Sequence, residues 1–173
     1  MLSLVLMSAL AAQPAVGDVA PDFTVTSVDG AELKLSALVE KGPVILAFFP
    51  RAFTSGCTRE LSAYVSRYDD VKKAGGEIIA VSTDSAETSR KFRDSLKAPY
   101  PFVGDDKAVL TRLYDVKTFI ITLSRRVTFV IGPGRKVLAV QEGGDAVDPS
   151  GAVAACTLRA NTAVELVTDG GSR

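Results

Sequence analysis

Stretches of uninterrupted apolar residues alternate along this chain with segments in which apolar residues recur every three or four positions. Residues 44–49 and 78–81 are apolar throughout, as is typical of central strands that are covered on both faces. Between them, residues 57–71 carry apolar side chains at helical steps, and the glycine pair 75–76 would end that helix. The pattern therefore predicts a strand–helix–strand unit with two buried strands.

The segments on either side predict two hairpins. Strands over residues 20–26 and 31–35 would be joined by Asp29-Gly30, which is a strong hairpin signal. A second hairpin is expected over residues 127–140, with its turn at 132–135. Shorter elements complete the pattern: helical segments at 36–41, 84–96, 107–114 and 151–159, and a strand at 102–103.

The order of these elements predicts an α/β fold with a mixed central sheet. A chain of 173 residues suits one domain with a substantial core, and we assign that domain to residues 17–160. Residues 161–173 form a weakly patterned tail. Asp84 and Glu87 have the spacing of a capping box and would open the third helical segment.

Residues 1–12 form an apolar segment of the length found in the hydrophobic part of a signal peptide, and Ala9-Leu10-Ala11 has the small-x-small form of a cleavage site. The segment is too short to span a bilayer. No lysine or arginine precedes it, unlike in most signal peptides. We expect a periplasmic or secreted protein, with a cytoplasmic protein as the alternative.

Charge and composition exclude several classes of partner and of catalytic site. Twenty basic residues balance 20 acidic ones, so nothing indicates binding to nucleic acid or to an acidic membrane, and a small molecule or another protein is the expected partner. Cys57 and Cys156 lack the spacing of a zinc site or of a Cys-x-x-Cys pair. The chain has no histidine, which excludes Cys-His and Ser-His-Asp catalysis and histidine–metal sites.

Cys57 stands where the first buried strand gives way to a helix. Unpaired N–H groups and the positive end of the helix dipole at such a position favour a thiolate over a thiol. Arg51 and Arg59 lie close in sequence and could act in the same direction. Without histidine, the activation of Cys57 would depend on arginine and backbone amides.

Pro50, Thr54 and Cys57 form the motif Pro-x-x-x-Thr-x-x-Cys, and Glu60 follows three residues later. On these residues the chain resembles the peroxiredoxins of AhpC/TSA type, and within them the peroxiredoxin Q or bacterioferritin comigratory protein group. The resemblance extends over residues 19–140. It implies a thioredoxin-like fold with a mixed central sheet and an N-terminal β-hairpin.

The resemblance also implies a thiol-dependent peroxidase that reduces hydrogen peroxide and alkyl hydroperoxides with neither a metal nor an organic cofactor. Cys57 would be the peroxidatic nucleophile that becomes a sulfenic acid. Thr54 would present a hydroxyl to the thiolate and the peroxide, and Pro50 would shield the thiolate from water. Arg126 would hold the thiolate form, and Glu60 would orient Arg126 through an ion pair. The structural alternatives are a helix cap for Thr54, a strand stop for Pro50 and an ordinary first-turn acid for Glu60.

Two features depart from the peroxiredoxin Q group. A resolving cysteine often lies five residues after the first in that group, where this chain has Ser62; Cys156 is then the possible resolving cysteine, with an inert core residue as the alternative. The segment 115–125, which would form the outer wall of the pocket, is shorter than peroxiredoxins usually have there. We expect a monomer or homodimer recycled by a thioredoxin-like protein or a small thiol. A non-enzymatic redox sensor or holdase on the same fold is the alternative function.

Overall fold

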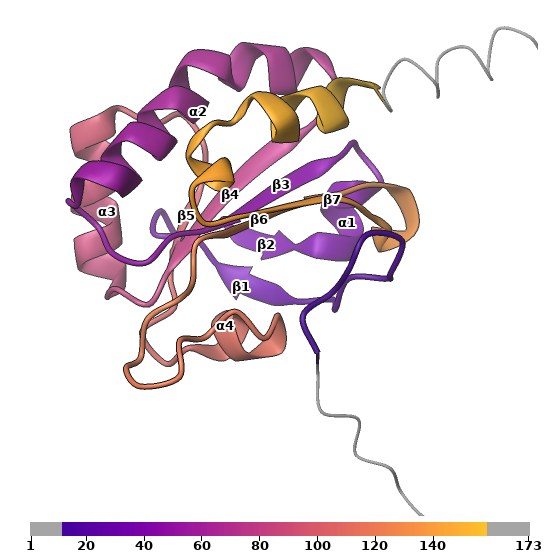
Figure 1. The fold of residues 1–173 in the computed structure, drawn as a ribbon. Coiled ribbons are helices and arrows are strands. Elements are labelled where there is room, and N and C mark those ends of the chain that lie inside the picture. Colours follow the sequence, from indigo (N-terminus) through magenta and orange to yellow (C-terminus); the bar gives the residue numbers. More distant parts are fainter. Residues whose placement is uncertain (1–11, 159–173) are drawn as a thin grey trace, which may run out of the picture.

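The computed structural model describes residues 12–158, and the predictions for residues 1–11 and for the tail from residue 159 lie outside this part of the chain. A five-stranded sheet of order β5-β4-β3-β6-β7 runs through the centre (Figure 1). β3 is parallel to β4 and antiparallel to β6, so the sheet is mixed as predicted. Its strands are β3 (Val44–Phe48), β4 (Glu77–Ser82), β5 (Phe102–Gly104), β6 (Val127–Ile131) and β7 (Val137–Glu142).

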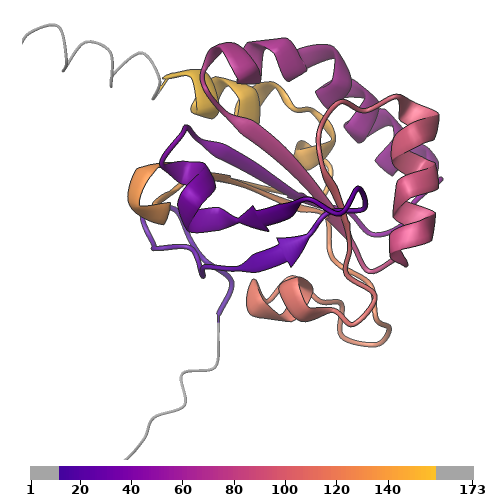
Figure 2. The same ribbon diagram turned by 180° about the vertical axis from the view of Figure 1, so that it is seen from behind.

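Helices cover one face of this sheet, and a hairpin with two short helices covers the other (Figures 1 and 2). The first face carries α2 (Ser55–Lys73), α3 (Ala86–Leu96) and a helical segment over residues 150–158. The second face carries β1 (Thr24–Thr26), β2 (Glu32–Lys34), α1 (Leu35–Val39) and α4 (Val109–Leu113). Two 3-10 turns, η1 (Pro133–Arg135) and η2 (Asp145–Val147), follow β6 and β7.

β3 lies between two apolar cores, as its uninterrupted apolar sequence predicts. Leu46 and Phe48 join the core on the hairpin side, whereas Ile45 and Ala47 join the core beneath α2, because successive side chains of a strand point to opposite faces. The predicted strands, hairpins and helices within residues 12–158 are confirmed with shifts at their ends, the largest being β1, which begins at Thr24 and not at residue 20. No helix in this range is both long enough and apolar enough to cross a membrane.

The predicted capping box at the start of α3 is wrong. Ser85 is the N-cap residue, and its side chain accepts a hydrogen bond from the Thr88 N–H. Asp84 instead accepts hydrogen bonds from the Ala52 N–H at 2.7 Å and from the Ser82 hydroxyl at 3.0 Å. The carboxylate is therefore used to fix the loop between β3 and α2.

Gly42 packs against the backbone of the turn that follows α2. A Cβ atom at this position would lie 2.0 Å from the Gly75 carbonyl oxygen. We expect Gly42→Ala to lower the free energy of unfolding by about 3 kcal/mol, because the backbone must move to remove the overlap. Gly144→Ala is the matched control: Gly144 has a φ of −62° and open space around it, so this change should be neutral or stabilise by about 0.5 kcal/mol. Urea unfolding measures both variants, and equal destabilisation would contradict the packing argument.

Candidate active site

The loop between β3 and α2 is held in place from two sides. It starts after Phe49, whose carbonyl accepts a hydrogen bond of 2.6 Å from the buried Ser124 hydroxyl. The Asp84 carboxylate holds the Ala52 N–H. Pro50 follows the strand and is half-buried, and it cannot donate a hydrogen bond that would continue the ladder. The loop that precedes the candidate cysteine is thus fixed by side chains from the segment after β4 and from the segment before β6.

Cys57 lies in the first turn of α2 and is 1% exposed. Its Sγ accepts a hydrogen bond from the Arg126 Nη2 at 3.3 Å. The topology explains this contact: β6 runs antiparallel to β3 with Val127 opposite Phe48, so the residue before β6 lies beside the residues that follow β3. The sulfur therefore has a guanidinium beside it and the N-terminal amides of a 19-residue helix around it, and both favour negative charge.

Glu60 is fully buried and forms an ion pair with the Arg126 Nη1. Cys57 and Glu60 are three residues apart on α2, so the two Nη groups of one guanidinium reach both side chains. Burial raises the pKa of the Glu60 carboxyl to about 7, and the positive charge of Arg126 opposes that rise. The ion pair expected between Glu60 and Arg126 is present.

Gly56 is a part of this arrangement that the sequence did not indicate. A Cβ atom at residue 56 would lie 3.0 Å from the Arg126 Nη2. The missing side chain leaves room for the guanidinium next to Cys57. Asp84 and Ser124, which hold the loop, were also missed, because side-chain bonds to a distant backbone leave no periodic signal in a sequence.

Thr54 makes no hydrogen bond to the Cys57 sulfur in this structure. It is exposed at the N-cap position of α2, where its side chain makes no cap hydrogen bond, and its hydroxyl donates to the Arg51 carbonyl at 3.1 Å. Arg51 and Arg59 both have exposed side chains. Among residues 12–158, the guanidinium that is hydrogen-bonded to Cys57 is that of Arg126.

Cys156 lies far from this site. Its Sγ is next to Gly76 and Val71, at the C-terminal end of α2, whereas Cys57 is in the first turn. The helical rise between residues 57 and 71 is about 20 Å, which is much longer than the reach of a disulfide. Both cysteines are free, and burial raises the pKa of the Cys156 thiol to about 11.

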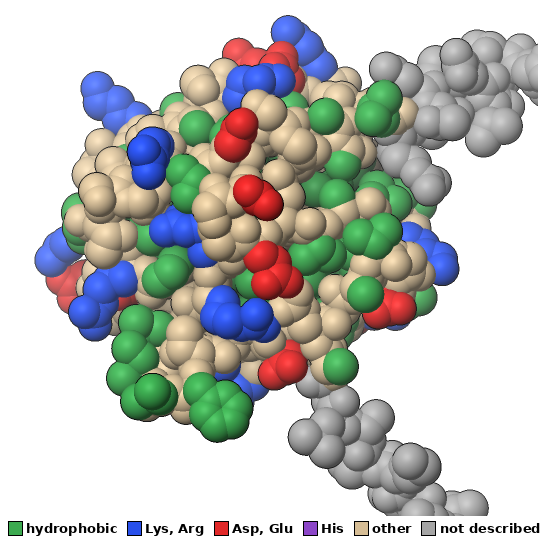
Figure 3. Space-filling model, viewed as in Figure 1, with side chains coloured by type: hydrophobic (Ala, Val, Ile, Leu, Met, Phe, Trp, Pro, Cys, Tyr) green, Lys and Arg blue, Asp and Glu red, His purple; other side chains and the backbone are tan. Residues whose placement is uncertain are grey.

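The short segment before β6 forms a loop beside the site with an apolar tip. Phe119 and Ile120 are fully exposed, and Figure 3 shows hydrophobic side chains gathered over the loop between α4 and β6. Thr83 ties this loop to the end of β4 by donating a 3.0 Å hydrogen bond to the Thr122 carbonyl. Arg125, the neighbour of Arg126 in sequence, donates a 2.8 Å hydrogen bond to the Asp115 carbonyl.

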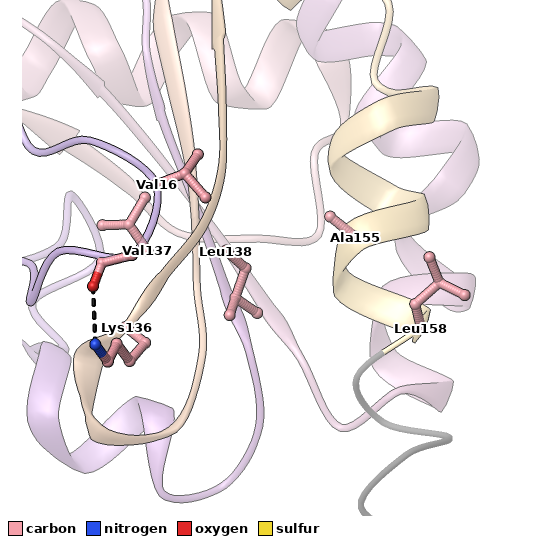
Figure 4. Close-up of a pocket in the computed structure, with 7 residues that line it drawn as sticks. Val16, Lys136, Val137, Leu138, Ala155 and Leu158 are labelled. Atoms are coloured by element: carbon pink, nitrogen blue, oxygen red, sulfur yellow. Dashed lines mark hydrogen bonds between the residues drawn. The ribbon is translucent and has the colours of Figure 1, made fainter.

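A cavity of about 550 Å³ lies elsewhere, between the start of the domain, β7 and the helical segment 150–158 (Figure 4). Lys136 is the charged residue among its described lining residues, and its ammonium donates to the Gly17 carbonyl at 2.9 Å. Neither cysteine lines this cavity. Its described lining thus offers no thiol, and the chemistry is expected at Cys57.

The comparisons with known proteins agree with this geometry. The model of the AhpC/TSA family matches residues 16–140. The chloroplastic peroxiredoxin Q of Triticum aestivum is 34% identical over 116 residues, which cover 66% of this chain and 53% of the wheat protein. The crystal structure of peroxidoxin BcpB from Mycobacterium tuberculosis has a TM-score of 0.77 and 30% identity, covering 83% of this chain and 96% of that one. The bacterioferritin comigratory protein of Xanthomonas campestris shares the fold, with a TM-score of 0.73 at 23% identity over 80% of this chain and 92% of that one.

Proposed function

Because the chain belongs to the AhpC/TSA family and is a thiol peroxidase of the peroxiredoxin type, we propose that Cys57 is the residue that attacks the peroxide. The observation that supports this assignment best is the hydrogen bond of 3.3 Å from Arg126 to the Cys57 Sγ at the N-terminus of α2. A thiolate is the nucleophilic form of cysteine. The guanidinium and the helix amides are the groups that would keep Cys57 in that form.

In the proposed reaction the Cys57 thiolate attacks one oxygen of the peroxide. An S–O bond forms, the O–O bond breaks, and the second oxygen leaves as an alkoxide or hydroxide that is protonated to an alcohol or water. Sulfur is oxidised to a sulfenic acid, and the peroxide is reduced. Arg126 and the N–H groups of α2 are placed to stabilise the charge that develops on the leaving oxygen.

Access to the sulfur depends on the residues just before it. Cys57 is 1% exposed, whereas Thr54 is exposed, so we propose that the peroxide reaches the sulfur past this residue. Rotation of the Thr54 side chain away from the Arg51 carbonyl would turn its hydroxyl towards the incoming peroxide. Pro50 limits the movement of the loop backbone during this step.

The protein acts on a peroxide and needs a reductant. We propose that the sulfenic acid on Cys57 is reduced directly by a thiol from outside the chain, either of a thioredoxin-like protein or of a small molecule. The position of Cys156 at the far end of α2 supports this route, because a disulfide with Cys57 would require α2 or its surroundings to unfold.

Intact mass after one equivalent of peroxide tests both proposals. We expect the reduced protein to gain one oxygen atom, located on Cys57 by peptide mapping, and Cys156→Ser to behave in the same way. A loss of two hydrogens in the wild-type monomer would instead mean a disulfide between Cys57 and Cys156, and a covalent dimer would mean resolution between subunits. Oxygen found on a residue other than Cys57 would refute the assignment of the nucleophile.

A further inference from the structure

The buried part of the site contains two acidic groups and one cation. Cys57 is 1% exposed and Glu60 is fully buried. Arg126 contacts both of them, and its side chain is 14% exposed. Within residues 12–158, no lysine or arginine is buried to the extent that Glu60 is, so no second cation compensates these two acids in the interior.

This charge balance disfavours ionising both acids at once. A thiolate and a carboxylate around one guanidinium would leave a net negative charge in a region from which water is excluded, and burying an unbalanced charge is costly. Two acids that compete for one cation titrate as a coupled pair, and the loss of a proton from one makes the second loss harder. One proton is therefore expected to stay on the pair.

We propose, building on the assignment of Cys57 as the nucleophile, that Cys57 and Glu60 share one proton across Arg126, so that Glu60 holds the proton while Cys57 is a thiolate. The pair then exchanges between a thiol with a carboxylate and a thiolate with a carboxylic acid, with the same net charge. Glu60 makes no hydrogen bond to the Cys57 sulfur and acts on it through Arg126.

The surroundings of Glu60 are suited to a neutral carboxyl group. Its Oε1 is buried and has no hydrogen-bond partner, which is the costly case for a carboxylate and a less costly one for a carboxylic acid. The Tyr64 and Thr128 hydroxyls are also buried and lack a hydrogen-bond partner. Burial and the charge of Glu60 both raise the pKa of Tyr64. The titratable and charged groups around Glu60 are Cys57 and Tyr64 on α2, Arg126 before β6 and Tyr100 before β5.

The shared proton supplies what peroxide cleavage needs in a chain without histidine. When the thiolate becomes a neutral sulfenic acid, no anion on residue 57 competes with Glu60 for Arg126, so Glu60 ionises and releases its proton. The alkoxide that leaves beside the same guanidinium takes up that proton. In the balanced reaction, the Cys57 thiolate, the Glu60 carboxylic acid and ROOH give the Cys57 sulfenic acid, the Glu60 carboxylate and ROH. An S–O bond forms, the O–O bond breaks, and each side carries one negative charge.

Infrared spectroscopy of the carboxyl C=O stretch tests the proposal without turnover. We expect a protonated carboxyl band in the reduced wild-type protein, and a pH midpoint for that band about one unit higher than in Cys57→Ser, which has no thiolate to compete with Glu60. Oxidation by one equivalent of peroxide should lower the midpoint in the same way. Glu87→Gln, which removes an exposed glutamate paired with Lys91, is the control and should leave the band unchanged. Equal midpoints in the wild type and Cys57→Ser would overturn the proposal.

Glu60→Gln separates the shared proton from a purely orienting role. If the proton is shared, the neutral amide frees Arg126 for Cys57, and the pH midpoint of the thiolate ultraviolet absorbance should fall by about one unit. The kcat/KM for alkyl hydroperoxides, whose leaving group needs a proton, should fall about 100-fold more than that for peracids, whose leaving carboxylate does not. A higher thiolate midpoint, or equal losses with both substrates, would mean that Glu60 only orients Arg126.

The two proposals can fail separately. If peroxide consumption survives in Cys57→Ser, the assignment of the nucleophile is wrong, whatever the carboxyl band shows. If consumption is lost but the band midpoint is the same in wild type and Cys57→Ser, the nucleophile stands and the shared proton does not. This comparison does not require Glu60→Gln to fold.

Discussion

Replacing Cys57 with serine should abolish peroxide consumption, with a loss in kcat/KM on the order of 10⁴-fold or more, as for other catalytic nucleophiles. Serine keeps the size and the hydrogen-bonding capacity of the side chain, but its hydroxyl is not ionised beside Arg126 at neutral pH. The first turn of α2 should stay intact because residue 57 is buried and the change adds no volume. Stopped-flow measurement of peroxide loss with excess reductant gives the result directly.

Cys156→Ser is the matched control for this experiment. Its sulfur lies next to Gly76 and Val71, at the other end of α2, and does not contact Arg126. We expect its rate of the first peroxide reaction to stay within about twofold of wild type, as for a change away from the reacting groups. Unchanged consumption in Cys57→Ser, or equal losses in the two variants, would refute the proposed site. Stoichiometric oxidation without cycling when thiols are supplied would indicate a sensor.

The sequence indicated the part of the site that is local. The apolar run of β3, the proline after it and the periodicity of α2 place Cys57 in the first turn of a helix behind a central strand, and the structure has it there. These features depend on neighbouring residues, so they leave patterns of fixed spacing. The contact between Arg126 and Cys57, which are 69 residues apart, was expected only from the resemblance to peroxiredoxins.

Other details depend on tertiary contacts that compete with local rules. Asp84 and Ser85 can each cap a helix, and the sequence alone favoured Asp84 because of its spacing to Glu87. In the fold the Ala52 N–H reaches Asp84, and Ser85 takes the cap position instead. Thr54 likewise donates to a carbonyl of its own loop and not to the sulfur. Both outcomes follow from where the loop is held.

Arg126→Lys should lower kcat/KM for peroxide by about 10² to 10³-fold, the range seen when a donor that stabilises developing charge is removed. Lysine keeps a positive charge, but a single ammonium cannot reproduce the fork in which one Nη contacts Cys57 and the other contacts Glu60. The thiolate absorbance at neutral pH should therefore fall together with the rate. Stopped-flow kinetics and ultraviolet titration measure the two effects.

Arg125→Lys provides the neighbouring control for this change, because the Arg125 side chain bonds to the Asp115 carbonyl and to Gln13. It should keep its rate within about twofold of wild type, as expected for a surface substitution. Similar urea unfolding midpoints for the two variants would exclude unfolding as the cause of any difference. Wild-type kinetics in Arg126→Lys would show that positive charge near α2 is sufficient, and that the paired contacts to Cys57 and Glu60 are not required.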